Sequence, residues 1–213
     1  MRHWNLAYAV ALTLWVGVGA TGPVAHAVEA DTAGAQKGLT ASLITDEVIA
    51  EAREFLANPL VAMSIGMQND KRRGIDQRQI DALDQQWRTE AGLSEKPLTA
   101  ATLSNPLSSY LTRVQARSLG AYTEIFVMDA YGLNVGQSGI TSDYWQGDEA
   151  KWQKTYPVGP DAVFVDEAEW HEDSRTWRAQ LSVAVVDPAT GLAIGAATFE
   201  LNLTELQRRA FQR

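Results

Sequence analysis

The stretch YTEIFVMDAYGLNVGQSGITSDYWQGDEAKW, residues 122–152, decides the fold of this chain. Its first part, residues 122–128, is dense in aromatic and β-branched side chains, which is typical of a strand. Asp129 and Gly132 take the first and fourth positions of a type I turn, where these residue types are favoured. We therefore expect the chain to reverse there and to return as a second strand over residues 133–137.

More strands are expected on the C-terminal side of this stretch. Residues 143–152 predict a short helix, and residues 162–165 predict a short strand. Residues 177–186 alternate between an apolar set and a set that is mostly polar, which is the pattern of a half-buried antiparallel strand. The turn DPATG, residues 187–191, connects this strand to its partner over residues 192–201.

The N-terminal half has helical periodicity instead. A long first helix is expected from Asp46, and the Asn-Pro pairs at residues 58–59 and 105–106 place a capping residue before a first-turn proline. Asp76 and Asn202 are placed to cap two further helices. Helices followed by antiparallel strands, with one short inserted helix and one closing C-terminal helix, indicate an α+β fold.

Composition limits the possible partners. The chain has 213 residues and a formal net charge of −8, which argues against nucleic acid and anionic membrane surfaces, because both attract a basic face. It contains no cysteine, so disulfides and thiolate chemistry are excluded. The length fits one domain with a sizeable core.

Residues 1–27 have the pattern of a secretory signal peptide. An apolar run over residues 6–18 follows a basic start and precedes the motif AHA at residues 25–27, after which we expect cleavage. The alternative is an uncleaved anchor, although the run is short for a membrane span. We expect a flexible leader over residues 28–44, a single domain over residues 45–213, and a periplasmic or secreted location.

Three segments carry a family resemblance. They are YTEIFVMDAYGLNV at residues 122–135, TSDYWQGDEAKW at residues 141–152 and LSVAVVDPATGLAIGAATFELNL at residues 181–203. A strand that ends in Asp-x-x-Gly, an aromatic and acidic segment after it, and a closing glycine-containing hairpin together resemble the extracytoplasmic single Cache sensor domains, which are PAS-like and also called PDC domains. The likeness covers most of the chain after the predicted signal peptide.

The resemblance implies a PAS-like antiparallel sheet of five or six strands, with a ligand pocket on one face beneath the segment 141–152. It also implies binding of a small extracellular metabolite, such as a carboxylate, an amino acid or an amine. Because no output domain follows Arg213 in this sequence, we expect the domain to report to a membrane-bound sensor kinase or receptor. A homodimer through the N-terminal helices is a further expectation.

The segment 143–152 offers aromatic and acidic side chains to a ligand. On a helix, Tyr144, Asp148 and Trp152 are four residues apart and share a face, with Trp145 beside them. Aromatic faces and carboxylates suit a cationic or amphipathic ligand. The alternative is that the tryptophans pack this helix onto the sheet while Asp148 faces water.

Polar side chains on two strands are the other candidates. Arg178, Gln180 and Ser182 form a polar row, from which Arg178 could hold a ligand carboxylate through two hydrogen bonds, or the row could simply face solvent. Glu124 is a polar residue in an otherwise apolar run. The predicted ligand-binding set is Tyr122, Glu124, Tyr144, Trp145, Asp148, Trp152, Arg178 and Ser182.

Catalytic and metal-binding motifs are absent from the sequence. It holds no Gly-x-Ser-x-Gly, His-Glu-x-x-His or phosphate-binding loop, and outside residues 1–27 its only histidine is His171. The acidic run over residues 166–173 matches no calcium-binding loop, and a solvated loop is expected there. We expect no enzyme activity, no metal and no cofactor. The alternative function is a ligand-free interaction module of the cell envelope, with an unrecognised hydrolase as the third hypothesis.

Overall fold

The computed structural model describes residues 40–212, so the predicted signal peptide (1–27) and residues 28–39 of the predicted leader lie outside the described residues. Ile44, at 8% exposure, already belongs to the core, which therefore begins slightly before the expected boundary at residue 45. The helices are η1 (Ala41–Leu43), α2 (Asp46–Leu56), α3 (Pro59–Lys71), α4 (Gln77–Glu90), α5 (Pro97–Leu103), α6 (Pro106–Arg117), α7 (Ala150–Gln153) and α8 (Leu203–Ala210).

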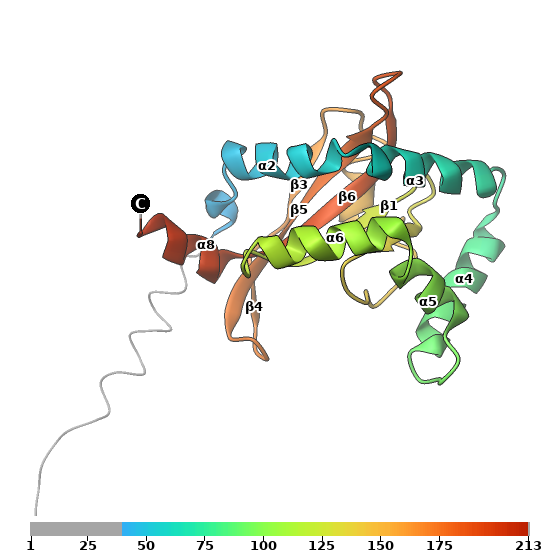
Figure 1. Ribbon diagram of the computed structural model, residues 1–213, viewed down its shortest axis with the longest axis horizontal. Helices are drawn as coiled ribbons and strands as arrows, with labels where there is room; N and C mark the ends of the chain where they lie inside the picture. The colour runs from blue at the N-terminus through green and yellow to red at the C-terminus, as the bar shows by residue number, and fades with distance from the viewer. Residues whose placement is uncertain (1–39, 213) are drawn as a thin grey trace, which may run out of the picture. The chain divides into compact units, whose positions relative to one another are not determined.

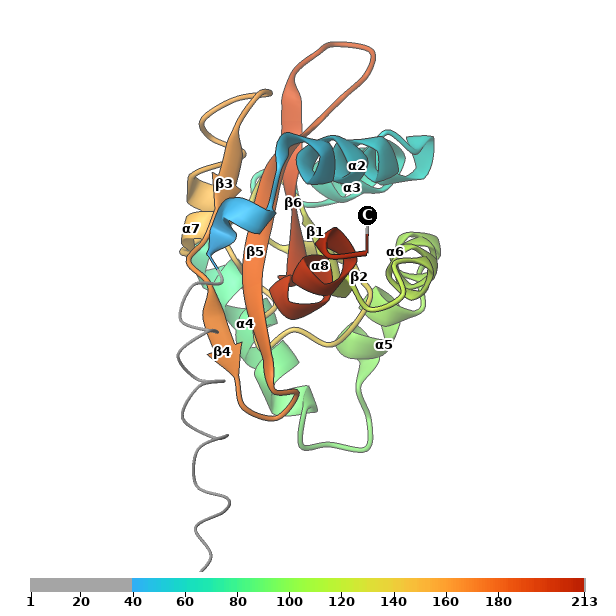
Figure 2. The same cartoon turned by 90° about the vertical axis from the view of Figure 1, so that its left-hand side faces the viewer.

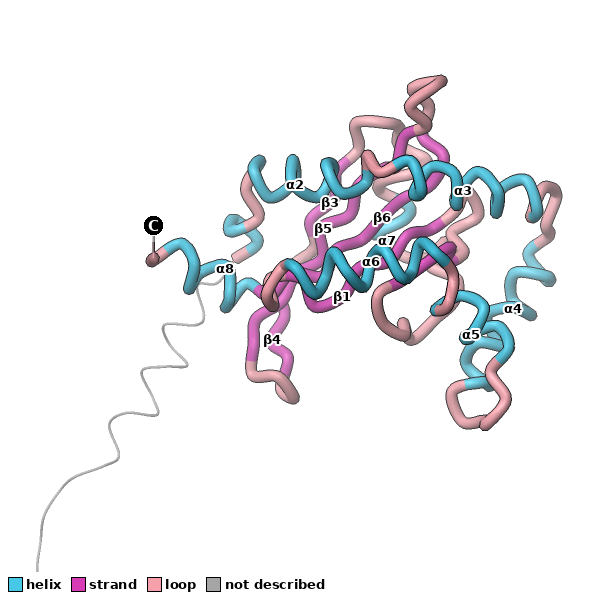
Figure 3. Tube along the Cα trace, viewed as in Figure 1, coloured by secondary structure: helices cyan, strands magenta, loops and turns pink. Residues whose placement is uncertain are grey.

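Six strands form one antiparallel sheet (Figures 1 and 3), which confirms the α+β prediction. The sheet order is β2-β1-β6-β5-β3, and β4 pairs with the same edge of β5 as β3 does. The strands are β1 (Tyr122–Met128), β2 (Asn134–Gln137), β3 (Val163–Val165), β4 (Glu169–His171), β5 (Thr176–Val186) and β6 (Ala193–Asn202). The β5–β6 hairpin that the alternating pattern and the turn at residues 187–191 predict is present, and it lies at the centre of the sheet.

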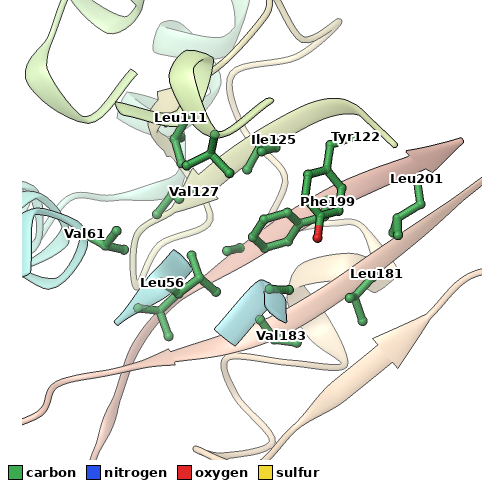
Figure 4. Packing of buried hydrophobic residues seen from close by; sticks show 14 of the residues in the cluster. Leu56, Val61, Leu111, Tyr122, Ile125, Val127, Leu181, Val183, Phe199 and Leu201 are labelled. Atoms are coloured by element: carbon green, nitrogen blue, oxygen red, sulfur yellow. The ribbon is translucent and has the colours of Figure 1, made fainter. Parts of the chain in front are cut away.

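Alternation of side chains along the strands separates two faces of the sheet. One face packs against α2, α3 and α6, which lie on the same side of the sheet in Figure 2. Its side chains form the main core, in which Ile125, Leu181 and Phe199 are fully buried (Figure 4). We call this the helix-covered face, and the opposite side of the sheet the open face.

The N-terminal helices begin at the predicted capping residues. Asn58 Oδ1 accepts a hydrogen bond from the Leu60 backbone N–H at 3.0 Å, and Pro59 is the first residue of α3. The long first helix expected from the sequence is thus two consecutive helices, α2 and α3. Asp76 forms a capping box with Gln79 at the start of α4. None of the helices within residues 40–212 has the length and apolarity needed to cross a membrane.

The helix predicted over residues 143–152 is wrong in extent, because only Ala150–Gln153 is helical. Trp145 instead forms an isolated antiparallel bridge with the chain just before β2. The Asp84 carboxylate of α4 accepts hydrogen bonds from the backbone N–H groups of Tyr144 and Trp145, at 2.9 and 3.1 Å. These contacts with a distant helix hold the segment extended, so tertiary structure overrides the local helical spacing.

Three elements have no counterpart among the sequence predictions: η1, which lies in the predicted leader, α5 and β4. α5 is capped from outside its own sequence, because the Glu90 carboxylate at the end of α4 accepts hydrogen bonds from the backbone N–H groups of Leu98 and Thr99, at 3.1 and 2.8 Å. β4 lies within the run 166–173, which the sequence presents as an acidic loop. Its pairing with β5 is a long-range contact that the composition of the run does not reveal.

Candidate functional site: a charged pocket on the open face of the sheet

Polar residues of three strands lie in a row across the open face. Strand pairing aligns Glu124 of β1 with Glu200 of β6, and Glu200 with Gln180 of β5. The adjacent row consists of Phe126, Thr198, Ser182 and Phe164. Two residues further along each strand, the open face therefore changes from charged to uncharged side chains. The helix-covered face, in contrast, is apolar along the length of the strands.

A cavity of about 230 Å³ lies over the charged row. β5 and β6 form one wall, and the start of α7 together with the β3–β4 region forms the other. Two cations, Lys151 and Arg178, contribute to the lining. We call this cavity the sheet-face pocket, and its acidic lining residues are Glu149, Asp166, Glu167, Glu169 and Glu200.

Each cation of the pocket forms an ion pair with a pocket carboxylate. Arg178 Nη1 lies 2.8 Å from Glu200 Oε2, and both side chains are largely buried, with 20% and 16% exposure. The Thr123 hydroxyl also donates to the Glu200 carboxylate. Lys151 Nζ lies 2.9 Å from Glu149 Oε2. The two pairs fix the charged side chains at opposite walls of the cavity.

Glu124 is the one member of the charged row whose charge is not directly matched. Within residues 40–212, its carboxylate makes no hydrogen bond and no ion pair. Burial raises its pKa above the ordinary value, and the neighbouring Glu200 carboxylate raises it further, while Lys151 and Arg178 act in the opposite direction. The arrangement leaves a partly buried carboxylate that would gain from an additional cation.

The segment between β2 and β3, residues 138–162, covers the rest of the open face. The Trp152 indole N–H donates to the Asp129 carbonyl at 3.1 Å, and its ring lies 5.4 Å from the Tyr156 ring. Both aromatic side chains pack against Phe126 and Met128 of β1. Trp152 thus covers the uncharged part of the face and leaves the charged row accessible at the sheet-face pocket.

Tyr122 lies on the helix-covered face, away from Glu124. Simple alternation places these two residues on the same face, because they are two positions apart. A β-bulge between them shifts the register, so that Tyr122 pairs with Leu201 and Glu124 with Glu200. The Tyr122 ring packs against Phe199, with ring centroids 5.4 Å apart. Tyr122 therefore belongs to the core and does not line the sheet-face pocket.

The three predicted residues that precede α7 also lie away from the pocket. Tyr144 is buried and stacks on Trp87 of α4, with ring centroids 5.4 Å apart. The Trp145 indole N–H donates to the Tyr131 carbonyl at 2.9 Å. Asp148 is exposed to solvent. The expected helical face of Tyr144, Asp148 and Trp152 does not exist, since the helix begins only at Ala150 and Asp148 lies in a turn before it.

Glu124, Arg178 and Ser182 are the predicted residues that share the open face. Arg178 lines the pocket, and Glu124 pairs across strands with the lining residue Glu200. Ser182 is buried one row away, with its hydroxyl 3.0 Å from that of Thr198. Sequence reasoning did not select Lys151 or Glu200. Glu200 carries the same signal as Glu124, a charged residue within an apolar strand, whereas Lys151 has no local signal.

Two of the larger cavities have a different character. One, of about 500 Å³, is mainly apolar and lies between the α2–α3 junction and the β5–β6 hairpin. The other, of about 470 Å³, lies between the end of α3 and α4, beside Arg72. Neither collects polar side chains from several strands, as the sheet-face pocket does. Within the described residues, no group of histidine and carboxylate side chains could hold a metal ion.

Neither a protein-family model nor a curated protein matches the chain. Among solved structures, it is similar to the ligand-binding domain of the Pseudomonas aeruginosa amino acid chemoreceptor PctC in complex with GABA, with 16% identity and a TM-score of 0.34 over 70% of this chain and 59% of that one. It is also similar to the sensory domain of the Campylobacter jejuni chemoreceptor Tlp3 with isoleucine bound (16% identity, TM-score 0.37, 78% of this chain and 64% of that one).

A third similar structure is the ligand-binding domain of the Pseudomonas fluorescens chemoreceptor CtaA in complex with L-serine (14% identity, TM-score 0.31, 68% of this chain and 56% of that one). The chain thus spans about three fifths of the length of the solved chains it matches. All three are ligand-binding or sensory domains of chemoreceptors. Since the TM-scores are below 0.5, we base the functional argument on the residues of this chain.

Proposed function

We propose that this chain is an exported, non-enzymatic sensor domain that binds a small molecule in the sheet-face pocket and reports it to a membrane-bound sensor kinase or receptor. The export rests on the signal-peptide pattern of residues 1–27 and predicts a periplasmic or secreted protein. The sensor role rests on the three sequence segments that resemble Cache domains. The ligand site rests on the structure of the open face.

The observation that carries the proposal is the convergence of polar side chains on one cavity. Residues of β1, β5, β6 and α7 bring two ion pairs and an unpaired carboxylate to a covered sheet surface. Burying charges in this way costs free energy of desolvation that a purely structural core avoids. Concave sites with a few convergent polar groups are the usual places for small ligands.

The absence of catalytic geometry supports a binding role over an enzymatic one. No serine, cysteine or threonine is among the residues that line the pocket, and His171, which does line it, is exposed. The residues that line this pocket therefore do not include the combination of a nucleophile, a base and an orienting group. We propose that a ligand bound in the pocket stabilises the surrounding elements and is released chemically unchanged.

A thermal-shift screen of the purified protein tests the proposal. The ligands are amino acids, amines, short carboxylates and purines, one class at a time. A ligand that binds only the native state raises the melting temperature, by an amount that grows with concentration above Kd. We expect a concentration-dependent rise for one chemical class, and no turnover of that ligand over the time of the measurement.

Two variants assign the response to the sheet-face pocket. Gln180→Trp adds a large side chain to the charged row and is expected to abolish the shift. Ala116→Trp adds the same side chain to the exposed surface of α6 and is expected to preserve it. A shift that survives Gln180→Trp would place the ligand elsewhere, and a folded parent protein with no response to any class would refute the sensor function.

The surface of α3 favours a second candidate, a protein-interaction module. From Pro59 to Asn69 this helix has no charged residue, and Met63 and Met67 on its outer side are 62% and 71% exposed. Exposed apolar side chains on an uncharged helix suit contact with another protein, including a second copy of this chain. The absence of any thermal shift in the screen would favour this function.

A further inference from the structure

Lys151 and Arg178, the two cations of the sheet-face pocket, already form ion pairs with carboxylates of the protein. Beside its ion pair with Glu200, Arg178 donates through Nη2 to the Ser174 hydroxyl at 3.0 Å and through Nε to the Thr176 hydroxyl at 3.4 Å. Lys151 is held by Glu149 at 2.9 Å. Nε, Nη1 and Nη2 of Arg178 each already donate a hydrogen bond, so a ligand carboxylate that binds two of these nitrogens would have to compete with their present partners.

The remaining charges of the pocket are negative. Asp166, Glu167 and Glu169 line the pocket, and Glu124, the cross-strand neighbour of the lining residue Glu200, makes no hydrogen bond or ion pair inside residues 40–212. A cation that entered the pocket would therefore gain an electrostatic partner without breaking an existing pair. An anion would meet an excess of like charge and would lose more hydration than it regains.

Lys151 shows that the pocket accommodates an ammonium group. Its side chain is only 13% exposed, and Nζ lies 5.4 Å from the centroid of the Phe126 ring on β1. The same ammonium group acts electrostatically on Glu124. An aromatic face next to carboxylates is a favourable environment for an organic cation. The tethered lysine therefore occupies part of a region whose chemistry suits a second, free ammonium group.

We propose that the sheet-face pocket selects small organic cations that lack a carboxylate, with Glu124 as the counter-ion of the ligand's ammonium group. This inference rests on the proposed function and narrows it to a ligand class. The cavity volume of about 230 Å³ sets the size of the ligand. It is below the range of roughly 300–1,000 Å³ typical of drug-sized ligands, so the ligand is a short aliphatic amine or diamine.

Isothermal titration calorimetry with four probes of equal carbon-chain length tests the charge preference. The probes are putrescine, butylamine, γ-aminobutyrate and butyrate, which share a chain of four carbons and differ in the charged groups at its ends. We expect putrescine and butylamine to bind, γ-aminobutyrate to bind at least about tenfold more weakly than butylamine, and butyrate to show no binding, because carboxylates meet unpaired negative charge.

Two substitutions with opposite expected effects assign the roles. Glu124→Gln keeps the shape of the side chain and removes its charge, so the Kd of butylamine should rise by about tenfold or more. Lys151→Met removes the competing ammonium group, so the same Kd should fall. Asp148→Asn, an exposed carboxylate outside the pocket, serves as the matched control and should leave the Kd unchanged.

The outcomes separate the two proposals. Tighter binding of γ-aminobutyrate or butyrate than of butylamine, or an unchanged Kd in Glu124→Gln, would overturn the cation assignment and leave the sensor function in place. Binding of a purine or carboxylate from the broader screen, with no binding of any amine, would have the same meaning. A folded protein that binds no member of either set would refute the proposed function itself.

Discussion

Different interactions stabilise the two faces of the sheet. On the helix-covered face, β1, β5 and β6 contribute apolar side chains to one continuous core beneath α2, α3 and α6 (Figures 2 and 4). On the open face, the same strands contribute Glu124, Arg178 and Glu200, with charges that are partly buried. One face is stabilised by the removal of apolar surface from water, and the other requires ion pairs to offset desolvation.

The charged side chains of the open face indicate a requirement other than stability, namely ligand binding as proposed above. The row of Phe126, Thr198, Ser182 and Phe164 shows that this face can be built without charged side chains. The charged side chains Glu200 and Arg178 lie beside that row, and the cavity lies over them. Local departures from the most stable choice are typical of functional sites.

The largest expected effect tests the helix-covered face. Phe199 is completely buried and packs against Tyr122, so Phe199→Ala should lower the free energy of unfolding by about 3–5 kcal/mol. Urea denaturation followed by tryptophan fluorescence measures this loss. The matched change on the open face is Gln180→Ala on the neighbouring strand, with an expected loss below about 1 kcal/mol. Similar losses in the two variants would contradict the contrast between the faces.

An intermediate effect is expected where the open face is polar but uncharged. Ser182 and Thr198 are both fully buried, and their hydroxyl oxygens are 3.0 Å apart. Thr198→Val keeps the shape and leaves the Ser182 hydroxyl without its partner, at a cost of about 1–2 kcal/mol in the free energy of unfolding.

The double variant Ser182→Ala/Thr198→Val removes both hydroxyls and controls for this loss. It should be more stable than the sum of the two single changes predicts, because no unpaired group remains. A strictly additive result from the three unfolding curves would show that the two hydroxyls do not interact.

The sequence predicts the fold well because its main signals are local. Asn58 and Asp76 cap the helices that they were expected to cap, and the alternating run of residues 177–186 forms β5. Asp129 and Gly132 make the expected turn, with the Gly132 N–H bonded to the Asp129 carbonyl at 3.1 Å. Such features depend on neighbours in the chain, so pattern reasoning detects them.

The site is harder to predict because its geometry depends on distant contacts. The bulge that separates Tyr122 from Glu124 appears only in the pairing of β1 with β6. The extended course of Tyr144 and Trp145 is imposed by Asp84, about sixty residues earlier in the chain. Sequence reasoning therefore selected Glu124 and Arg178, which lie on the open face, but it placed Tyr144 and Trp145 on a helix that the structure does not form there.

The smallest expected effect on the free energy of unfolding is in the charged row. There a substitution should stabilise the protein, whereas the substitutions above destabilise it. Burial and Glu200 raise the pKa of Glu124 in the native state, so the native state binds its proton more tightly than the unfolded chain does. The stability contributed by this group is present at low pH and is lost as pH rises through the native pKa, in a window above the ordinary value of 4.5. Glu124→Gln should therefore make the ligand-free protein slightly more stable than the parent at neutral pH, with a difference that disappears in acid.

Melting temperatures of the parent and of Glu124→Gln across this pH window measure the effect, with the exposed Asp148→Asn as the control that should follow the parent. Glu200 of β6, Lys151 of α7 and Arg178 of β5 are the charged groups that act on Glu124, and the variant retains all three. A less stable variant at neutral pH would mean that the Lys151 and Arg178 charges already compensate Glu124. A more stable one would show that the open face keeps a carboxylate whose removal improves folding, which is the expected property of a residue retained for ligand binding.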